Sequence, residues 1–356
     1  MNKSFYIYGA GIVATGIYTA IKELHKLLPI AFLVSGRDGN PAQIDGISVK
    51  VLSEKEVAAL DRSAVILVAA PEVHHQSIEE SLLKYGIHKE QIILVDNQLE
   101  NTIMEQYYKS LSEFETLGEI LKETGEQNDI RVFQAKCHVD KPLKNSMETP
   151  SYVCPIQVGA ALTDERITEV SDNIGENISG KNRNYCELTA TYYAWKNDKS
   201  AYKGLCHYRR IFDIQEEKLQ KIFSCQKDID VILPYPSIHY PDIRGQHNRY
   251  VNEQDWNAML QAINEVAPEY TKVFDDIFSE QYFYNYNMLI AKREVFDDYC
   301  SFLFSVLERT EQLTCPKGNE RADRFAGYLG ENLTTLYFRA NRDKLRIVHV
   351  GKIWNT

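Results

Sequence analysis

The sequence of 356 residues lacks several features that define common protein classes. It has no apolar stretch of 18 residues, so no membrane-spanning helix is expected, and no apolar signal segment precedes the first strand. Its seven cysteines are scattered and never spaced Cys-x-x-Cys, which argues against a zinc site or a disulfide framework. This cysteine usage predicts reduced thiols in a cytoplasmic protein.

Excess positive charge is also missing. The formal net charge is −10, which argues against a nucleic-acid-binding protein. Internal repeats and low-complexity tracts are absent too. Hydrophobic residues make up 44% and charged residues 25%, the balance of a soluble globular protein long enough for two domains.

The first hundred residues alternate short apolar runs with helical stretches. This alternation predicts an α/β fold with a parallel sheet and right-handed crossovers, a small Rossmann-like domain over residues 1–97. Residues 98–128 are charged and helix-forming and predict a helical linker. Residues 129–356 combine isolated strands with long polar loops and predict a second α/β domain.

A glycine-rich turn follows the first predicted strand and opens a helix. Gly9, Gly11 and Ala14 have the spacing of the dinucleotide fingerprint, in which backbone amides at a helix N-terminus approach a phosphate. Its acidic residue is missing, because residues 34–37 at the end of the second strand read Val-Ser-Gly-Arg. Two interpretations stay open: nucleotide or nucleotide-sugar binding, and a turn needed only for close packing.

A second candidate site begins in the polar loop "DNIGENISGKNRN". Lys181 and Arg183 precede a predicted helix whose start is marked by Asn184 and Glu187, a plausible N-cap pair. Basic side chains beside a helix N-terminus are typical of an anion-binding site. The alternative is a solvated loop in which Arg183 pairs with Glu187.

The stretch "YKGLCHYRRIFD" carries the strongest signal. Its apolar run predicts an interior strand that delivers His207, Arg209 and Arg210 to the carboxyl edge of the sheet, where open α/β sheets bind ligands. Two arginines can grip a diphosphate, and a histidine can add a hydrogen bond. Salt bridges to surface carboxylates are the alternative.

Several segments together resemble a family of glycosyltransferases encoded in bacterial capsular and exopolysaccharide loci. The similar segments, within about residues 130–350, are "IQVGAAL", "DNIGENISGKNRNYCELTATYYAWKN", "YKGLCHYRRIF", "FYNYNMLI" and "GYLGENLTTLYF". The resemblance implies a GT-A-like fold that binds a nucleotide-sugar at the centre of an open α/β sheet. Residues 1–97 lie outside it and form an appended domain.

The sequence departs from many GT-A enzymes in its metal-binding motif. Where an Asp-x-Asp would hold a divalent cation on the donor, the chain reads His-Tyr-Arg at 207–209. We expect Arg209 and Arg210 to replace the metal, so metal-independent chemistry is favoured. A divalent cation held by Asp213 and His207 is the alternative.

The resemblance also suggests an acceptor side. Asn285 and Asn287 approach a predicted strand that would line the cleft beside the donor sugar, and they are expected to bind hydroxyls of the donor, unless they only tie down a loop. Glu331, placed in the first turn of a helix, is the first candidate for the base of an inverting transfer. Asp323 and Asp213 are reserve candidates. The long polar segment 239–256 is expected to cover the acceptor.

The sequence therefore predicts a hexosyltransferase. Its expected donor is a nucleotide-sugar, by analogy a UDP-sugar, and the hexose could be galactose in pyranose or furanose form. The expected acceptor is a glycan or lipid-linked oligosaccharide, so at most peripheral contact with the inner face of the cell membrane is predicted. The alternatives are an NAD-dependent oxidoreductase and a nucleotide-sensing, glycan-binding protein.

Overall fold

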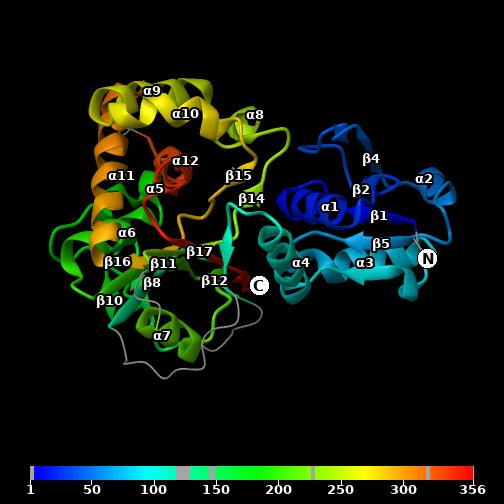
Figure 1. The fold of residues 1–356 in the computed structure, drawn as a ribbon, viewed down its shortest axis with the longest axis horizontal. Helices are drawn as coiled ribbons and strands as arrows, with labels where there is room; N and C mark the ends of the chain where they lie inside the picture. Colours follow the sequence, from blue (N-terminus) through cyan, green and yellow to red (C-terminus); the bar gives the residue numbers. More distant parts are fainter. Residues whose placement is uncertain (1–3, 118–128, 144–148, 226–228, 318–320, 356) are drawn as a thin grey trace.

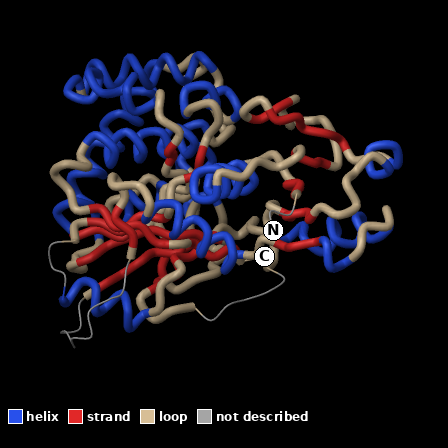
Figure 2. Tube along the Cα trace, turned by 45° about the vertical axis from the view of Figure 1, so that its right-hand side comes forward, coloured by secondary structure: helices blue, strands red, loops and turns tan. Residues whose placement is uncertain are grey.

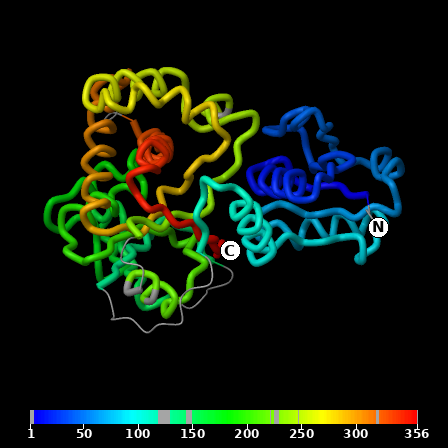
Figure 3. The backbone as a smooth tube through the Cα atoms, in the orientation of Figure 1, coloured from blue at the N-terminus to red at the C-terminus, as the bar shows by residue number. Residues whose placement is uncertain are grey.

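The computed structural model describes residues 4–117, 129–143, 149–225, 229–317 and 321–355. Two α/β units lie side by side, and helix α4 (Asn97–Lys109) lies at their boundary (Figure 1). The C-terminus ends at the same boundary (Figure 3), where Trp354 and Asn97 exchange hydrogen bonds. Among the described residues, no helix is both long and apolar enough to cross a membrane.

The N-terminal unit is built on one sheet. Its elements are β1 (Phe5–Tyr8), α1 (Ile12–His25), β2 (Phe32–Val34), β3 (Gln43–Ile44), β4 (Ile47–Val51), α2 (Glu54–Ala58), β5 (Val65–Val68), η1 (Glu72–His74), α3 (His75–Lys84), η2 (Lys89–Gln91) and β6 (Ile92–Leu94). The strand order is β3-β4-β2-β1-β5-β6, and all neighbours are parallel except β3 and β4. The parallel strands β4-β2-β1-β5-β6 follow the first five positions of the doubly wound order 3-2-1-4-5-6. The predicted parallel α/β architecture is confirmed.

The hairpin of β3 and β4 had not been predicted. Asp45 and Gly46 both have positive φ, 50° and 77°. This is the backbone that an Asp-Gly turn between two strands favours, so a signal for the hairpin was present in the sequence.

The C-terminal unit contains a larger mixed sheet. Its strands are β8 (Ile130–Lys136), β9 (Val153–Gln157), β10 (Val170–Ser171), β11 (Tyr202–His207), β12 (Arg210–Phe212), β13 (Val231–Pro234), β16 (Leu289–Lys292), β17 (Ile347–Val350) and β18 (Lys352–Trp354). The order is β10-β9-β8-β11-β16-β13-β17-β7, with β12 joining β11 to β18. Strand β16 runs antiparallel to both neighbours, β11 and β13. The predicted interior strand at Gly204–Cys206 is confirmed as part of β11.

Helices and short segments complete this unit. They are η3 (Ala160–Leu162), η4 (Ser179–Lys181), α5 (Asn182–Tyr185), α6 (Leu188–Asn197), α7 (Glu216–Cys225), the strand β14 (Ser237–Ile238), α8 (Ile243–Gln246), η5 (His247–Arg249), α9 (Glu253–Val266), η6 (Pro268–Tyr270), α10 (Thr271–Phe278), the strand β15 (Tyr282–Phe283), α11 (Arg293–Leu313) and α12 (Phe325–Ala340). Most helices cover one face of the sheet, and α7 covers the other (Figures 1 and 2). Alternation along the strands matches these two layers: Val231 and Leu233 pack in the larger core, and Ile232 packs towards α7.

The segment predicted as a linker belongs to both units. Helix α4 packs on α1, and the short strand β7 (Glu115–Thr116) pairs with β17 of the larger sheet. Tyr108 of α4 contacts the C-terminal unit. Its hydroxyl donates a hydrogen bond to the Pro236 carbonyl at 2.8 Å, and its ring stacks on Tyr235. Residues 118–128 of the predicted linker lie outside the described residues.

Candidate active site

The site is built around the end of β11. His207 is the last residue of this strand, which is parallel to β8, so both carboxyl edges lie together. His207 pairs across a tight turn with Arg210, the first residue of β12. Its Nε2 atom is hydrogen-bonded to the Tyr286 carbonyl, and burial lowers the pKa of the imidazole. A neutral His207 is therefore fixed at the predicted edge of the sheet.

The helix predicted to start at Asn184 is interrupted, and the predicted N-cap pair is wrong. Asn184 lies inside α5, where its amide donates to the Arg321 carbonyl. Cys186 separates α5 from α6 with a positive φ of 51°. This break turns Glu187 towards β11, where its Oε1 lies 4.0 Å from His207 Nε2 and accepts a 2.7 Å hydrogen bond from Asn287. Sequence reasoning had missed Glu187 as a site residue because it treated it as a capping group.

Glu331 is the second carboxylate of the site. The expectation that it lies in the first turn of its helix is wrong, because α12 begins at Phe325 and Glu331 falls in the second turn. Its Oε1 accepts a 2.9 Å hydrogen bond from the Tyr286 amide. Burial, reinforced by the nearby charge of Glu187, raises the pKa of Glu331 to about 8. A carboxyl group with this pKa can hold or release a proton near neutral pH.

Strained backbone surrounds these carboxylates. Within the described residues, six non-glycine residues have positive φ, and four of them belong to this site: Cys186, Tyr286, Asn287 and Arg324. Such conformations cost of order 1–3 kcal/mol each and cluster at functional sites. Here they place the Tyr286 amide on Glu331 and the Asn287 side chain on Glu187.

Basic side chains form the rim of the site. The Arg210 guanidinium lies 4.0 Å from the Tyr286 ring centroid and 4.3 Å from that of Trp354. Its buried Nε has no hydrogen-bond partner within the described residues. Arg324 donates from Nε to Cys186 Sγ at 3.2 Å, and both arginines act to lower the pKa of Glu331. An unused donor between two aromatic rings is suited to an anionic ligand.

Arg209 lies in the turn between His207 and Arg210. Its guanidinium is 5.0 Å from the Tyr208 ring centroid, and its charge opposes the raised pKa that burial gives Asp140. The structure therefore brings together the predicted residues His207, Arg210, Asn287 and Glu331, while Arg209 next to them in the chain lies beside Tyr208 and Asp140.

Two other residues that were predicted to bind the nucleotide-sugar donor are bonded to protein side chains. Lys181 forms an ion pair with Glu311 of α11 at 2.6 Å, and the Asn285 side chain accepts from Ser237 Oγ at 2.9 Å. Arg183 is exposed in α5. The loop that carries Lys181 is organised by buried Asp172, which accepts hydrogen bonds from the Gly159 and Ala160 amides.

The reserve candidates for the base are engaged elsewhere. Asp213 is exposed and accepts a 2.8 Å hydrogen bond from Asn101 of α4, at the boundary of the two units. Asp323 pairs with Arg321, which also grips buried Asp255 through both terminal nitrogens. Glu331 is thus the predicted carboxylate that lies with His207 and Arg210.

A search of the described residues finds no group of three or more His, Cys, Asp or Glu side chains that could hold a metal ion. In the Asp-x-Asp at 228–230, Asp230 pairs with Lys292 at 2.8 Å and accepts from the Arg346 amide, while Asp228 lies outside the described residues. Metal-independent chemistry stays a prediction.

The glycine-rich turn opens onto a cavity that Arg249 and Tyr250 of the C-terminal unit also line. Gly9 has a φ of 127°, and a Cβ there would lie 2.4 Å from the Ala69 carbonyl oxygen. Ala14 is fully buried beneath it, whereas a Cβ on Gly11 would meet open space. Gly9 and Ala14 therefore serve packing, and Gly11 faces a cavity of about 660 Å³ that His74 and Ser35 also line.

Comparison with solved structures relates the fold to glycosyltransferases. The chain is similar to the apo structure of the bifunctional glycosyltransferase WbbM, with 24% identity and a TM-score of 0.55. The match covers 64% of this chain and 46% of WbbM, so the chain spans less than half of that protein. The mannosyltransferase Ktr4p from S. cerevisiae also matches, at 12% identity, 72% and 81% coverage and a TM-score of 0.26, too low for an argument.

No curated protein matches the sequence. The model of one protein family, described as a domain of unknown function, matches residues 136–342, which is more than half of the chain and contains Glu187, His207, Arg210 and Glu331 of the site. The chain therefore belongs to the DUF4422 family.

Proposed function

We propose that the protein is a glycosyltransferase that moves a hexose from a nucleotide diphosphate donor to a glycan acceptor. The observation that carries the proposal is the group formed by Glu331, Glu187 and His207 beside the unpartnered donor of Arg210. This group lies at the carboxyl edge of a sheet whose fold is similar to that of a glycosyltransferase. By analogy the donor is a UDP-sugar such as UDP-galactose, in pyranose or furanose form.

Each residue has a defined part in the proposed inverting reaction. The Glu331 carboxylate takes the proton of an acceptor hydroxyl, whose oxygen forms a bond to the anomeric carbon. The bond from that carbon to the diphosphate breaks, and its electron pair leaves with the diphosphate. Arg210 and Arg209 bind the leaving group through charge-assisted hydrogen bonds. These cations would stabilise the departing charge without a divalent metal.

Glu187 and His207 would prepare this chemistry. Glu187 helps to hold the pKa of Glu331 near the working pH, and Asn287 fixes the Glu187 carboxylate. Neutral His207 holds the 286–287 backbone that bonds Glu331. Within the described residues Glu331 Oε2 has no hydrogen-bond partner, which leaves it available to an acceptor hydroxyl.

The proposed biological setting is capsular or exopolysaccharide synthesis. A lipid-linked acceptor at the inner face of the cell membrane would need only peripheral contact. This part of the proposal rests on the resemblance of the sequence motifs to the transferases of those loci.

Thermal unfolding with and without ligands tests the proposal. UDP, GDP, CDP, UDP-sugars and NAD should each be added with manganese and with a chelator. A ligand at a hundredfold its dissociation constant should raise Tm by roughly 4 °C or more. We expect stabilisation by UDP or a UDP-sugar that survives the chelator and is lost in Arg210→Gln.

A sugar-transfer assay follows with the donor that stabilises best. The matched control is Glu311→Gln, which removes a mostly buried carboxylate outside the site. Stabilisation by NAD alone, without any sugar transfer, would contradict the proposal and favour an oxidoreductase.

A further inference from the structure

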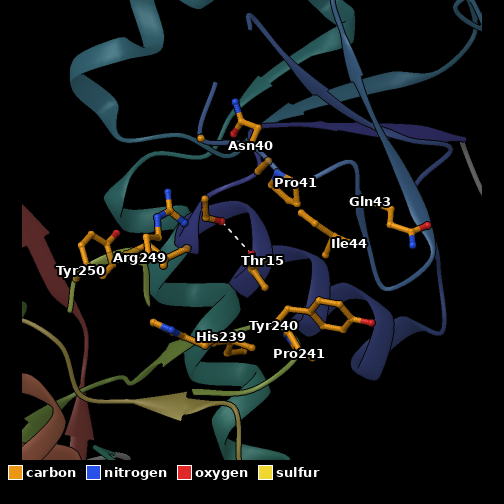
Figure 4. A pocket seen from close by; sticks show the side chains of 15 residues that line it. Thr15, Asn40, Pro41, Gln43, Ile44, His239, Tyr240, Pro241, Arg249 and Tyr250 are labelled. Carbon is orange, nitrogen blue, oxygen red and sulfur yellow. Dashed lines mark hydrogen bonds between the residues drawn. The ribbon is translucent and has the colours of Figure 1, made fainter. Parts of the chain in front are cut away.

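A second site lies where the two units meet. Two cavities of about 530 and 660 Å³ share the glycine-rich turn at Ala10–Ile12 on one side and Arg249 and Tyr250 on the other. The turn belongs to the N-terminal unit, and Arg249 and Tyr250 belong to the segment 239–256 of the C-terminal unit. Figure 4 shows Arg249 beside the start of α1, with Asn40 and Pro41 on one side of the smaller cavity and His239 and Tyr240 on the other.

The N-terminal unit supplies the positive end of a helix. Gly11 is the N-cap of the 14-residue helix α1, it has no side chain to cap the first amides, and no acidic residue stands in the first turn. These amides carry partial positive charge and suit an anion. The Asp or Glu that commonly occupies such a position in other helices is missing here.

The C-terminal unit supplies an unpartnered polar group. His239 is only 8% exposed and lines the smaller cavity, yet its buried Nε2 has no hydrogen-bond partner within the described residues. Its backbone is held by a 2.8 Å hydrogen bond to the Gln281 carbonyl, and its ring packs on Phe283. Burial, and secondly the charge of Arg249, lower the pKa of His239 to about 4. A buried, neutral imidazole without a partner costs free energy unless a ligand uses it.

Arg249 adds the charge that an anionic ligand requires. It is exposed and forms no ion pair within the described residues, and its guanidinium lies beside the Tyr250 ring. By contrast, Arg244 in the same segment is paired with Asp275 at 2.8 Å. Arg249 is therefore a cation that lines the cavity and has no counter-ion among the described residues.

We infer that the space formed by these two neighbouring cavities binds a phosphorylated ligand of mononucleotide size. Its phosphate would lie on the first turn of α1 and Arg249, and His239 would be a further hydrogen-bonding group. The volumes lie in the range of small-molecule sites and are much larger than a phosphate ion needs. The walls also offer apolar and aromatic surface, including Ile12, Ile44 and Tyr250, against which a base or sugar can pack. The ligand spans both units, so each unit contributes part of the site.

The site is also joined to the candidate active site. The Tyr250 ring stacks on Tyr328 of α12, with centroids 5.5 Å apart. Tyr328 lies one turn before Glu331 on the same helix, and its ring is 5.8 Å from the Arg324 guanidinium. A ligand that holds Arg249 and Tyr250 in place therefore also holds Tyr328, which lies beside Arg324 and one turn from Glu331.

Binding is tested on the full-length protein by calorimetry with UMP, UDP, AMP, NAD and inorganic phosphate as probes. The variant Gly11→Asp places a carboxylate where the phosphate would lie, and because Asp is a good N-cap the helix should stay folded. We expect at least one nucleotide to bind, with affinity reduced about tenfold in Arg249→Gln and more in Gly11→Asp. The matched controls are Arg244→Gln, from the same segment, and Gly11→Ser, a cap without charge.

The variant Arg210→Gln separates this site from the donor site. Binding that survives Arg210→Gln and is lost in Gly11→Asp supports the inference whether or not the protein transfers sugars. The uridine and adenine probes then show whether the ligand shares its nucleotide with the donor or is a different nucleotide. The inference is overturned if no probe binds at millimolar concentration, if Gly11→Asp and Arg249→Gln bind as tightly as the unchanged protein, or if inorganic phosphate binds as tightly as every nucleotide.

Discussion

The candidate active site and the cavity between the units differ in how their polar groups are used. At the active site, Glu187, Glu331 and His207 are already bonded to the strained backbone and side chains at Tyr286 and Asn287. At the cavity, the described residues provide no hydrogen-bond partner for His239 Nε2, no ion pair for Arg249 and no side-chain cap for the first amides of α1. The first arrangement fixes reactive groups before a substrate arrives, as catalysis requires, and the second supplies a shape and a charge, as binding requires.

The largest expected effect belongs to Glu331. Replacing it by Gln should lower the rate of sugar transfer about 10³-fold, because the proposed base is removed while its shape is kept. Donor affinity, measured by calorimetry, should change little. Transfer within tenfold of the unchanged protein would show that another group accepts the proton.

The next effect concerns Arg210. The Arg210→Gln variant should weaken donor binding about a hundredfold, since a charge-assisted contact to the diphosphate is lost. Arg210→Lys should restore little, because a lysine cannot reproduce the planar stacking between Tyr286 and Trp354. An unchanged dissociation constant in both variants would place the diphosphate elsewhere.

The pH dependence of sugar transfer tests whether Glu187 raises the pKa of Glu331. Because the pKa of Glu331 is about 8, kcat/KM should rise with pH up to about that value. Replacing Glu187 by Gln removes a nearby negative charge, so the rise should move to lower pH. The control is Glu311→Gln, whose profile should match the unchanged protein. A Glu187→Gln profile that also matches it would mean that Glu187 does not tune the base.

The pH dependence of protein stability should also reflect the ionisation of Glu331. The folded-state pKa of Glu331 lies above the ordinary value of 4.5, so between about pH 4.5 and 8 the folded state binds more protons than the unfolded state. Stability should therefore fall as pH rises through this window. Glu331→Gln removes the effect, and its Tm relative to the unchanged protein should be several degrees higher at pH 8 than at pH 5. An equal difference at both values would contradict the raised pKa.

The smallest expected effect tests the connection between the two regions. Tyr250→Ala removes the stack on Tyr328, which is worth about 0.5–1.5 kcal/mol. Transfer without the cavity ligand should change less than tenfold, while any effect of that ligand on transfer should disappear. Tyr250→Phe keeps the ring and should behave as the unchanged protein. If the ligand still alters transfer in Tyr250→Ala, the stack does not carry the connection.

Much of the fold was predictable because local patterns determined it. Strands such as β1 and β5 are short apolar runs, and α1 follows β1 at the glycine-rich turn. The end of β11 was likewise predicted to carry His207 and Arg210 to the sheet edge. The break at Cys186 was not predicted, because "NYCELTATYYAW" has helical spacing throughout and contains no sign of the hydrogen bond that Arg324 donates to Cys186 Sγ in the folded protein.

The place of the segment 239–256 was likewise a tertiary result. Its polar character predicted a binding loop, and its cover of the acceptor stays a prediction. The structure lays Arg249 and Tyr250 against the glycine-rich turn of the other unit, more than two hundred residues away in the chain.

By itself the sequence determined the parallel α/β architecture, the helix that begins at Gly11, and the residue types at the end of β11, because each depends on neighbours within one turn or strand. Only the tertiary structure decided that Glu187 lies near Glu331, that Asn287 is a positioning group and that His239 Nε2 has no hydrogen-bond partner among the described residues. These properties depend on burial and on backbone conformations imposed from other segments, and a linear pattern does not contain them.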